Sequence, residues 1–558
     1  MTSGPVPVPA GSASADSVPS DPAELREVTT AVLREVLGVP EVLPDDDFFA
    51  LGGNSLLAVR VAGRLSRVVQ RRVPVTAVLD HPSARALADT LSPAPGARIP
   101  DTEGDRAAPA VAPHGPAVGT DVRNPLTAAQ RRVWLLHAVD PERIDHLVTS
   151  SFRITGAFDP AVARTAWTSV VRRHEALRTR FEEDDGETVQ IVDPEPLTDF
   201  RYLDLTALDE AVAARVVSEQ VRLQRGTPLD LVTGPPARVL LLRTAPDTYR
   251  LEVVVHHIVC DGWSVAVLFD DFLDAYRATV RGEPEAPPPA HRFSDHVRWE
   301  REVESRRWPG MTERVARRFE GRTDHLPLPV DPRDVDEHED GDDVELPVPP
   351  EVSAALAGIG KVTGYTRLTP ALAALGILLH RISGTDDVLI AVPVSGRVRP
   401  EDEATVGLFV NTALARVRLA GARDVPKLLA RVHEEVQEVL DCQTFPFDHL
   451  VSRLAPHREA GRMPLVRVSL AVQDFAEPAA PPPGLGFGWE WSDPPERQSK
   501  LDLAFSLWGG GAGAAERSLT ITYRPSLFRR STVEAWGEQY LVALGRVCDA
   551  ARRAETCD

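Results

Sequence analysis

A stretch rich in Pro, Ala and Gly between Ser92 and Arg123 divides this chain into two unequal parts. Such a composition with scattered charge is typical of a linker rather than of a folded core. The 558 residues are too many for one ordinary core, and a domain length of roughly 100 to 200 residues predicts three or four folding units. We therefore expect a small domain before the linker, free to move relative to a larger part after it.

The part before the linker has helical periodicity. Residues 1–20 lack apolar spacing and are expected to form a disordered leader. Asp21 as N-cap and Pro22 as first residue predict a helix that ends near Gly38. A second amphipathic helix is expected from Ser55 onward, and shorter ones over residues 75–79 and 84–91. Residues 21–92 are thus predicted to form a small all-α, four-helix bundle, with residues 93–123 as the flexible linker.

Strand and helix patterns alternate after the linker, which indicates an α/β architecture. A Pro-rich segment, residues 327–332, plausibly separates two halves of similar mixed character, which we delimit as residues 124–335 and 336–555. The expected helices cover residues 159–173, 264–280, 350–362 and 370–382, the last with Thr369 as N-cap, and the expected strands cover residues 239–242, 251–255 and 388–392.

Seven residues, His256 to Gly262, follow the strand over residues 251–255 and precede a helix, so two imidazoles and a carboxylate lie at a strand-to-helix corner. Adjacent strand residues point to opposite faces, so one imidazole is expected to have a chemical role while the other packs in the interior. Gly262 permits a tight corner, and Asp261 can lock the turn against a cation. Cys260 is expected to be a buried filler rather than a nucleophile. From spacing alone, a solvated strand end with two incidental histidines remains an open alternative.

A second constellation, Gly52-Gly53-Asn54-Ser55, places a serine hydroxyl at a glycine-flanked helix start. Taken alone, Ser55 could be an ordinary N-cap. The longer run from Asp47 to Ala58 resembles the signature of peptidyl and acyl carrier domains. This resemblance spans about 70 residues and implies that Ser55 carries a covalent 4'-phosphopantetheine arm.

The corner at residues 256–262 resembles the H-H-x-x-x-D-G motif of nonribosomal peptide synthetase condensation domains. Five further segments resemble motifs of that family in the same order, namely residues 126–134, 173–181, 293–299, 406–412 and 445–451. The resemblance implies a peptidyl carrier domain followed by a condensation domain. Its fold would be a chloramphenicol-acetyltransferase-like pair of α/β lobes with the active site in a tunnel between them.

The resemblance also implies roles for individual residues. His257 is the expected catalytic imidazole, and the backbone N–H of Gly262 is expected to help stabilise the oxyanion. Asp261 is expected to be structural and to pair with Arg397, while His256 fixes the backbone. Two further residues, Trp263 and Asn411, either line the tunnel or belong to the core.

The implied reaction joins a tethered donor thioester to an acceptor amine, and the opening motif resembles the class that takes an L-configured donor. Heterocyclisation relatives carry an aspartate motif that this chain lacks, recruitment relatives carry a damaged motif, and epimerisation relatives differ in the other segments. A noncatalytic carrier-docking or recruitment module, and ester formation with a hydroxyl acceptor, remain the alternatives. The implied partners are a phosphopantetheinyl transferase, an adenylation domain that loads the carrier, and a downstream acceptor carrier domain or a soluble acceptor.

Composition and charge bear on the ligands and the cellular location that we expect for this protein. The formal net charge of −20 disfavours binding to nucleic acid, and no apolar run approaches the roughly 20 residues of a membrane helix. The four cysteines lack the spacing of a disulfide framework or a zinc site, so no metal is expected. The sequence starts without a secretory pattern, and we expect a cytoplasmic location. A natural didomain and an excised fragment are equally compatible with the sequence.

Overall fold

The structure is a computed structural model, and it describes residues 21–71, 73–92, 122–320, 326–331, 341–420, 424–454, 465–473, 481, 484–492, 501–509 and 516–555. The expected leader and residues 93–121 of the expected linker lie outside these ranges. Val122 and Arg123, which the sequence assigns to the linker, already belong to a strand that pairs with residues 189–192.

The carrier region folds into four helices, as predicted: α1 Pro22–Leu37, α2 Ser55–Val68, α3 Val75–Asp80 and α4 Ala84–Leu91. Asp21 caps α1, and Gly38 ends it in the left-handed conformation, with φ at 66°. Phe48 is fully buried together with Leu33, Leu65 and Val78, and the neighbouring Phe49 is buried against Gly360 of the second lobe. These side chains hold the loop that leads into α2.

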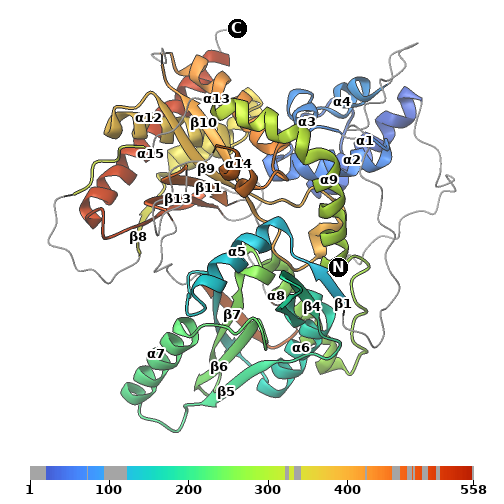
Figure 1. Cartoon of the computed structure of the whole chain (residues 1–558), viewed down its shortest axis with the longest axis vertical. Helices are drawn as coiled ribbons and strands as arrows, with labels where there is room; N and C mark the ends of the chain where they lie inside the picture. The colour runs from blue at the N-terminus through green and yellow to red at the C-terminus, as the bar shows by residue number, and fades with distance from the viewer. Residues whose placement is uncertain are drawn as a thin grey trace.

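The first lobe contains a five-stranded sheet in the order β12-β2-β7-β6-β5 and a small sheet in the order β1-β4-β3. Its strands are β1 Val122–Pro125, β2 Leu147–Gly156, β3 Thr179–Asp184, β4 Glu187–Val192, β5 Asp199–Asp204, β6 Ala237–Ala245 and β7 Thr248–His256. Its helices are α5 Ala128–Val139, α6 Pro160–Arg173, η1 Glu175–Arg178, α7 Glu210–Gly226, η2 His257–Val259 and α8 Gly262–Arg281. The long helix α9, Phe293–Phe319, then leads to the second lobe (Figure 1).

The second lobe is built on a six-stranded sheet in the order β10-β9-β11-β13-β14-β8. Its strands are β8 Asp342–Pro347, β9 Asp387–Val394, β10 Asn411–Arg418, β11 Val468–Gln473, β13 Leu503–Gly509 and β14 Glu516–Tyr523. Its helices are α10 Pro350–Ala357, α11 Ile359–Thr363, α12 Leu368–Ser383, η3 Pro400–Ala404, α13 Val425–Asp441, α14 Phe447–Leu454 and α15 Arg530–Glu555. The expected alternation of strands and helices is confirmed.

One strand crosses between the lobes. β12, Phe487–Ser492, follows β11 in the chain but pairs antiparallel with β2, from Phe487 opposite Gly156 to Ser492 opposite Ser151. Alternate residues of β12 face the first-lobe core, where the Phe487 ring lies 5.2 Å from Tyr276 and the Trp489 ring 4.6 Å from Phe152. A division at residue 335 therefore leaves part of the first-lobe sheet in the second half of the chain.

Two local expectations are wrong. α12 begins at Leu368, so Thr369 lies inside the helix and Arg367 occupies the cap position. Pro370 is tolerated there because the first N–H groups of a helix have no partner within the helix. The helix expected over residues 350–362 is interrupted at Gly358, which separates α10 from α11.

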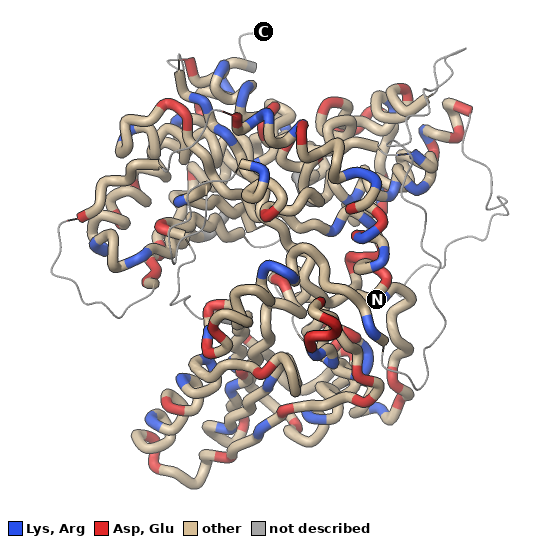
Figure 2. Tube along the Cα trace, in the orientation of Figure 1, with Lys and Arg blue, Asp and Glu red and all other residues tan. Residues whose placement is uncertain are grey.

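The carrier bundle packs against the second lobe, with α3 against α13 and α2 against η3 (Figure 1). Its buried side chains form one continuous apolar cluster with those of the second lobe. Basic and acidic segments are interspersed over the bundle and both lobes (Figure 2), and local ion pairs such as Arg60–Glu403 accompany the apolar packing at this contact. Among the described helices, none is long and apolar enough to cross a membrane.

Candidate active site

The histidine corner lies where β7 ends, and it continues through η2 into α8. β7 is the central strand of the five-stranded sheet, so both of its neighbours, β2 and β6, hold it in place. The backbone N–H of His257 donates to the carbonyl of His146 (2.7 Å), and that of His256 donates to Pro236 (2.9 Å). These bonds fix the point at which the chain leaves the sheet.

The imidazole of His257 is oriented by a bond to its own turn. Its Nδ1 lies 2.6 Å from the carbonyl oxygen of Cys260. Because a carbonyl oxygen can only accept, Nδ1 is the donor, and in the neutral ring the lone pair is then on Nε2. The side chain is only partly buried, in contrast to its neighbour His256. This tautomer suits a group that accepts a proton at Nε2.

His256 has different surroundings. It is 2% exposed, and its Nδ1 accepts the backbone N–H of Ile258 (3.1 Å). Its ring lies against those of His137 and His146, with centroids 5.6 and 6.3 Å away. The two adjacent histidines thus differ in burial and in bonding, and the reason is that β7 ends at His256 and η2 begins at His257, not the alternation of side chains along one strand.

Asp261 connects the corner to the loop formed by residues 396–410, hereafter the 396–410 loop. Its Oδ1 accepts from the Ser264 backbone N–H (2.8 Å), the Ser264 hydroxyl (2.7 Å) and Arg397 (3.0 Å). Its Oδ2 accepts the backbone N–H groups of Phe409 (3.0 Å) and Val410 (3.3 Å). The carboxylate therefore caps α8 and binds a loop from the other half of the chain at the same time.

Burial by itself would raise the pKa of Asp261, but the Arg397 charge and the hydrogen bonds from Ser264 and Phe409 hold it below the ordinary value. The carboxylate is thus kept ionised, and both of its oxygens accept hydrogen bonds. Burial raises the pKa of the Cys260 thiol far above its ordinary value, which disfavours the thiolate that a nucleophile requires.

Gly262 is the first residue of α8 and is exposed. At this position the backbone N–H has no partner within the helix and lies at the positive end of the helix dipole. Trp263 points instead to the 396–410 loop, where its indole N–H donates to the carbonyl oxygen of Glu403 (2.8 Å).

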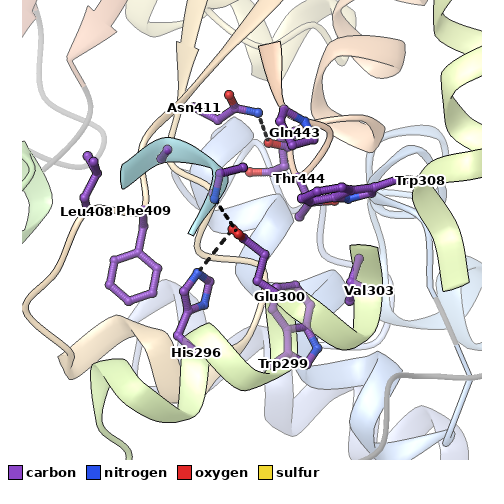
Figure 3. Close-up of a pocket in the computed structure, with 14 residues that line it drawn as sticks. His296, Trp299, Glu300, Val303, Trp308, Leu408, Phe409, Asn411, Gln443 and Thr444 are labelled. Atoms are coloured by element: carbon purple, nitrogen blue, oxygen red, sulfur yellow. Dashed lines mark hydrogen bonds and ion pairs between the residues drawn. The ribbon is translucent and has the colours of Figure 1, made fainter. Parts of the chain in front are cut away.

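A small cavity lies between α5, α9 and the 396–410 loop (Figure 3). Its lining combines aromatic rings with a few polar groups, among them Trp299, Trp308, Phe409, His296, Glu300 and Asn411. The Asn411 amide donates to the carbonyl oxygens of Gln443 (3.0 Å) and Phe445 (2.7 Å), so that group is engaged with the backbone.

Glu300 is the buried acid of this cavity. Its Oε1 accepts the Ala128 backbone N–H (2.7 Å), and its Oε2 lies 4.0 Å from Nε2 of His296 (Figure 3). Burial raises the pKa of Glu300 above its ordinary value, against the opposing effect of His296. No motif of the sequence singled out this carboxyl, since it is one polar residue within a long, highly charged helix.

Ser55 is the first residue of α2, and its side chain lies outside what the structure describes. Asn54 takes the capping role, because its side chain accepts the Leu57 backbone N–H (2.9 Å). The first turn of α2 holds no acidic residue, and the helix N-terminus favours a phosphate group. The cap that the sequence left open for Ser55 thus belongs to its neighbour, and the serine position fits a phosphodiester.

The family models match both parts of the chain. The condensation domain model matches residues 122–554, and the phosphopantetheine attachment site model matches residues 27–91. The chain belongs to the condensation-domain family. The condensation domain follows a carrier domain of the type that bears covalent 4'-phosphopantetheine, which confirms the predicted order of domains.

Curated relatives are nonribosomal peptide synthetases. The chain is 32% identical over 526 residues to phosphinothricin tripeptide synthetase PhsB of Streptomyces viridochromogenes, covering 93% of this chain and 43% of PhsB. It is 30% identical over 538 residues to the dimodular nonribosomal peptide synthase of Bacillus subtilis, covering 94% of this chain and 22% of the relative. The chain thus spans less than half the length of these relatives.

Solved structures support the two-lobed fold. The X-domain in its complex with OxyB from teicoplanin biosynthesis is 25% identical, with a TM-score of 0.66 over 78% of this chain and 95% of the X-domain chain. The first condensation domain of the CDA synthetase shares the fold at 22% identity, with a TM-score of 0.64 over 76% of this chain and 96% of its own.

Proposed function

We propose that the condensation domain forms an amide bond between an acyl group tethered to Ser55 and the amine of an acceptor. The observation that carries this proposal is the orientation of His257, whose Nδ1–H is committed to Cys260 so that Nε2 can accept a proton. The hydrogen bonds of the neighbouring Asp261 to both α8 and the 396–410 loop support a catalytic role for residues 256–262.

In this mechanism the phosphopantetheine arm supplies a thioester that activates the acyl carbon. His257 Nε2 takes a proton from the attacking amine as the C–N bond forms, and then returns it to the leaving sulfur as the C–S bond breaks. The backbone N–H of Gly262 donates to the carbonyl oxygen while it carries negative charge. Asp261 and Arg397 hold α8 and the 396–410 loop in fixed positions relative to each other, without touching the reacting atoms.

The carrier domain precedes the condensation domain, so the donor is the acyl group on Ser55 and the acceptor comes from another carrier domain or from solution. The opening segment, residues 126–134, resembles that of domains taking an L-configured donor. We further propose that a phosphopantetheinyl transferase modifies Ser55 and that an adenylation domain loads it. In the part of the chain that the structure describes, Cys260 and Cys442 are buried and form no disulfide, which is consistent with a cytoplasmic setting.

A recruitment role is the second candidate, because the X-domain that resembles this chain is described in complex with OxyB. Under that role the corner would have no reaction to perform. Ester formation with a hydroxyl acceptor would use the same residues as amide formation.

The decisive experiment loads an aminoacyl group onto Ser55 and offers an amine acceptor on a carrier protein. Wild-type chain should transfer the acyl group, and His257→Ala should slow transfer by about a hundredfold or more, since a positioned general base contributes roughly 10²–10⁴-fold. Ser55→Ala should remove both loading and transfer. Equal transfer by wild type and His257→Ala would contradict the catalytic role, and no transfer to either an amine or a hydroxyl acceptor would favour recruitment.

A further inference from the structure

The 396–410 loop lies between the carrier bundle and the histidine corner, and the short helix η3 contacts both. On the carrier side, the guanidinium of Arg60 in α2 binds the Glu403 carboxylate through two bonds, of 2.7 and 2.5 Å. Arg64 lies 3.7 Å from the same carboxylate, and Arg67 pairs with Glu401. Three arginines on one helix therefore meet two acids of η3.

The backbones also approach closely at this contact. A Cβ placed on Gly63 of α2 would lie 2.5 Å from the carbonyl oxygen of Val398, closer than real side chains come. A little further along, the Phe49 ring packs on Gly360 of α11, and the Val75 N–H donates to Asp441 of α13 (3.1 Å). The bundle thus fits this surface through shape as well as charge.

On the corner side, η3 is bonded to the residues that flank the reaction centre. The carbonyl oxygen of Glu403, whose side chain holds Arg60, accepts the indole N–H of Trp263 (2.8 Å). Arg397, the ion-pair partner of Asp261, donates to the backbone carbonyls of Asp402 and Thr405 at the two ends of the same turn. Asp402 itself is fully buried and is bound by Arg399 (2.7 Å) and His291 (3.1 Å).

We propose that Glu403 is a positioning residue that couples docking of the carrier domain to the geometry of the catalytic corner. Its side chain senses the presence of α2, while its backbone holds Trp263, the residue after Gly262. A docked carrier then stabilises η3, and η3 in turn steadies Trp263 and the Arg397–Asp261 pair. This inference rests on the proposed function for its catalytic meaning, but its structural content can be measured without any reaction.

Hydrogen exchange on the full-length chain tests the coupling. Arg60→Glu places like charges at the contact and should release α2, and Val75 N–H, bonded across the same interface, reports that release. The coupling predicts about tenfold faster exchange at the Ser264 and Phe409 amides, which bind Asp261, in the released form. The charge-swapped double variant Arg60→Glu/Glu403→Arg should slow both sets of amides again, which a merely structural defect would not do.

Arg34→Glu, an exposed charge reversal on α1, serves as the matched control and should leave all of these amides unchanged. Faster exchange at Val75 with unchanged exchange at Ser264 and Phe409 would overturn the coupling. Should Arg60→Glu fail to release α2, Gly63→Leu forces the helix from Val398, and the same comparison decides. A chain that passes this test but transfers no acyl group would instead refute the proposed function.

Turnover gives a second readout. With the unmodified chain and an aminoacyl thioester of N-acetylcysteamine as free donor, the carrier delivers nothing. Coupling therefore predicts a lower kcat in Arg60→Glu even for this free donor, with recovery in the double variant. Pure delivery by the carrier predicts a lower rate only for the donor tethered to Ser55.

Discussion

The 396–410 loop is held on its two sides by different kinds of contact. Toward the corner, Asp261 and Arg397 have side chains only 3% and 2% exposed, and every Asp261 oxygen has a partner. Toward the carrier, the side chains are more exposed, at 24% and 15% for Arg60 and Glu403 and at 53% and 30% for Arg67 and Glu401. Buried, multiply bonded charges are costly to separate, whereas exposed pairs contribute little. The inner ion pair is therefore a fixed part of the fold, and the outer ion pairs are the weaker of the two sets.

Removing the inner carboxylate should have the largest effect on stability. Asp261→Ala leaves Arg397 buried without its partner ion and removes the cap of α8, so we expect a loss of about 3–5 kcal/mol in the free energy of unfolding. Urea denaturation measures this loss. Asp274→Ala, at an exposed pair with Arg277 within α8, is the control and should change stability by less than about 0.5 kcal/mol. Similar values for both variants would remove the distinction between the two sides of the loop.

Adding a side-chain carbon at Gly63 should have opposite effects on the stability of α2 and on docking of the carrier domain. Gly63→Ala should stabilise α2 by up to about 1 kcal/mol, because Gly is a poor helix former. The new Cβ nevertheless meets the Val398 carbonyl, so the carrier should undock, visible as a larger radius of gyration in X-ray scattering. Gly310→Ala in α9, where the added Cβ meets nothing within 4 Å, should leave the radius unchanged. A compact Gly63→Ala chain would mean that the contact tolerates a shift.

Glu300, the acid of the cavity, is a second buried carboxyl, and unlike Asp261 it has no ion pair with an arginine among the residues that the structure describes. Because its pKa is raised, the folded chain prefers protonated Glu300, and this preference costs stability as the pH rises from the ordinary value of 4.5 through the raised one. Glu300→Gln imitates the protonated acid and keeps an oxygen for the Ala128 N–H. We expect the variant to be more stable than wild type at pH 8 and to lose most of that advantage at pH 5, measured by denaturation at both values. A gain independent of pH would contradict this account.

The smallest effect is expected at the exposed pair. Arg67→Ala should weaken docking of the carrier by no more than about 0.5 kcal/mol, and added salt should shrink the difference further. Exchange of the Val75 N–H at low and high salt measures it. A salt-independent loss comparable to that of Arg60→Glu would show that Arg67 belongs with the strong contacts.

The sequence predicts local structure well wherever a periodic pattern meets a terminal signal. α1 begins and ends where Asp21 and Gly38 indicate, and the corner lies at the end of a strand as expected. The family resemblance named Arg397 as the partner of Asp261, and the structure brings the two within 3.0 Å. Their roles in catalysis, like those of His257 and Gly262, stay predictions.

Contacts between residues far apart in the chain could not be predicted from local sequence patterns. Arg60 and Glu403 lie 343 residues apart, and each is one of many charged residues, so nothing local marks them as a pair. Capping by Asn54 rather than Ser55 also depends on loop geometry, since either residue type is a good N-cap. The cavity acid Glu300 is identified only once α5 folds against α9.

The strand β12 limits how the two halves of the condensation domain can be taken apart. A polypeptide cut after residue 335 would give a first fragment whose β2 edge is bare, with unpaired backbone groups that favour aggregation. The second fragment would carry the missing strand and, with it, Phe487 and Trp489 for the first fragment's core. Recovery of a soluble complex should therefore require that both fragments fold together, as in fragment complementation.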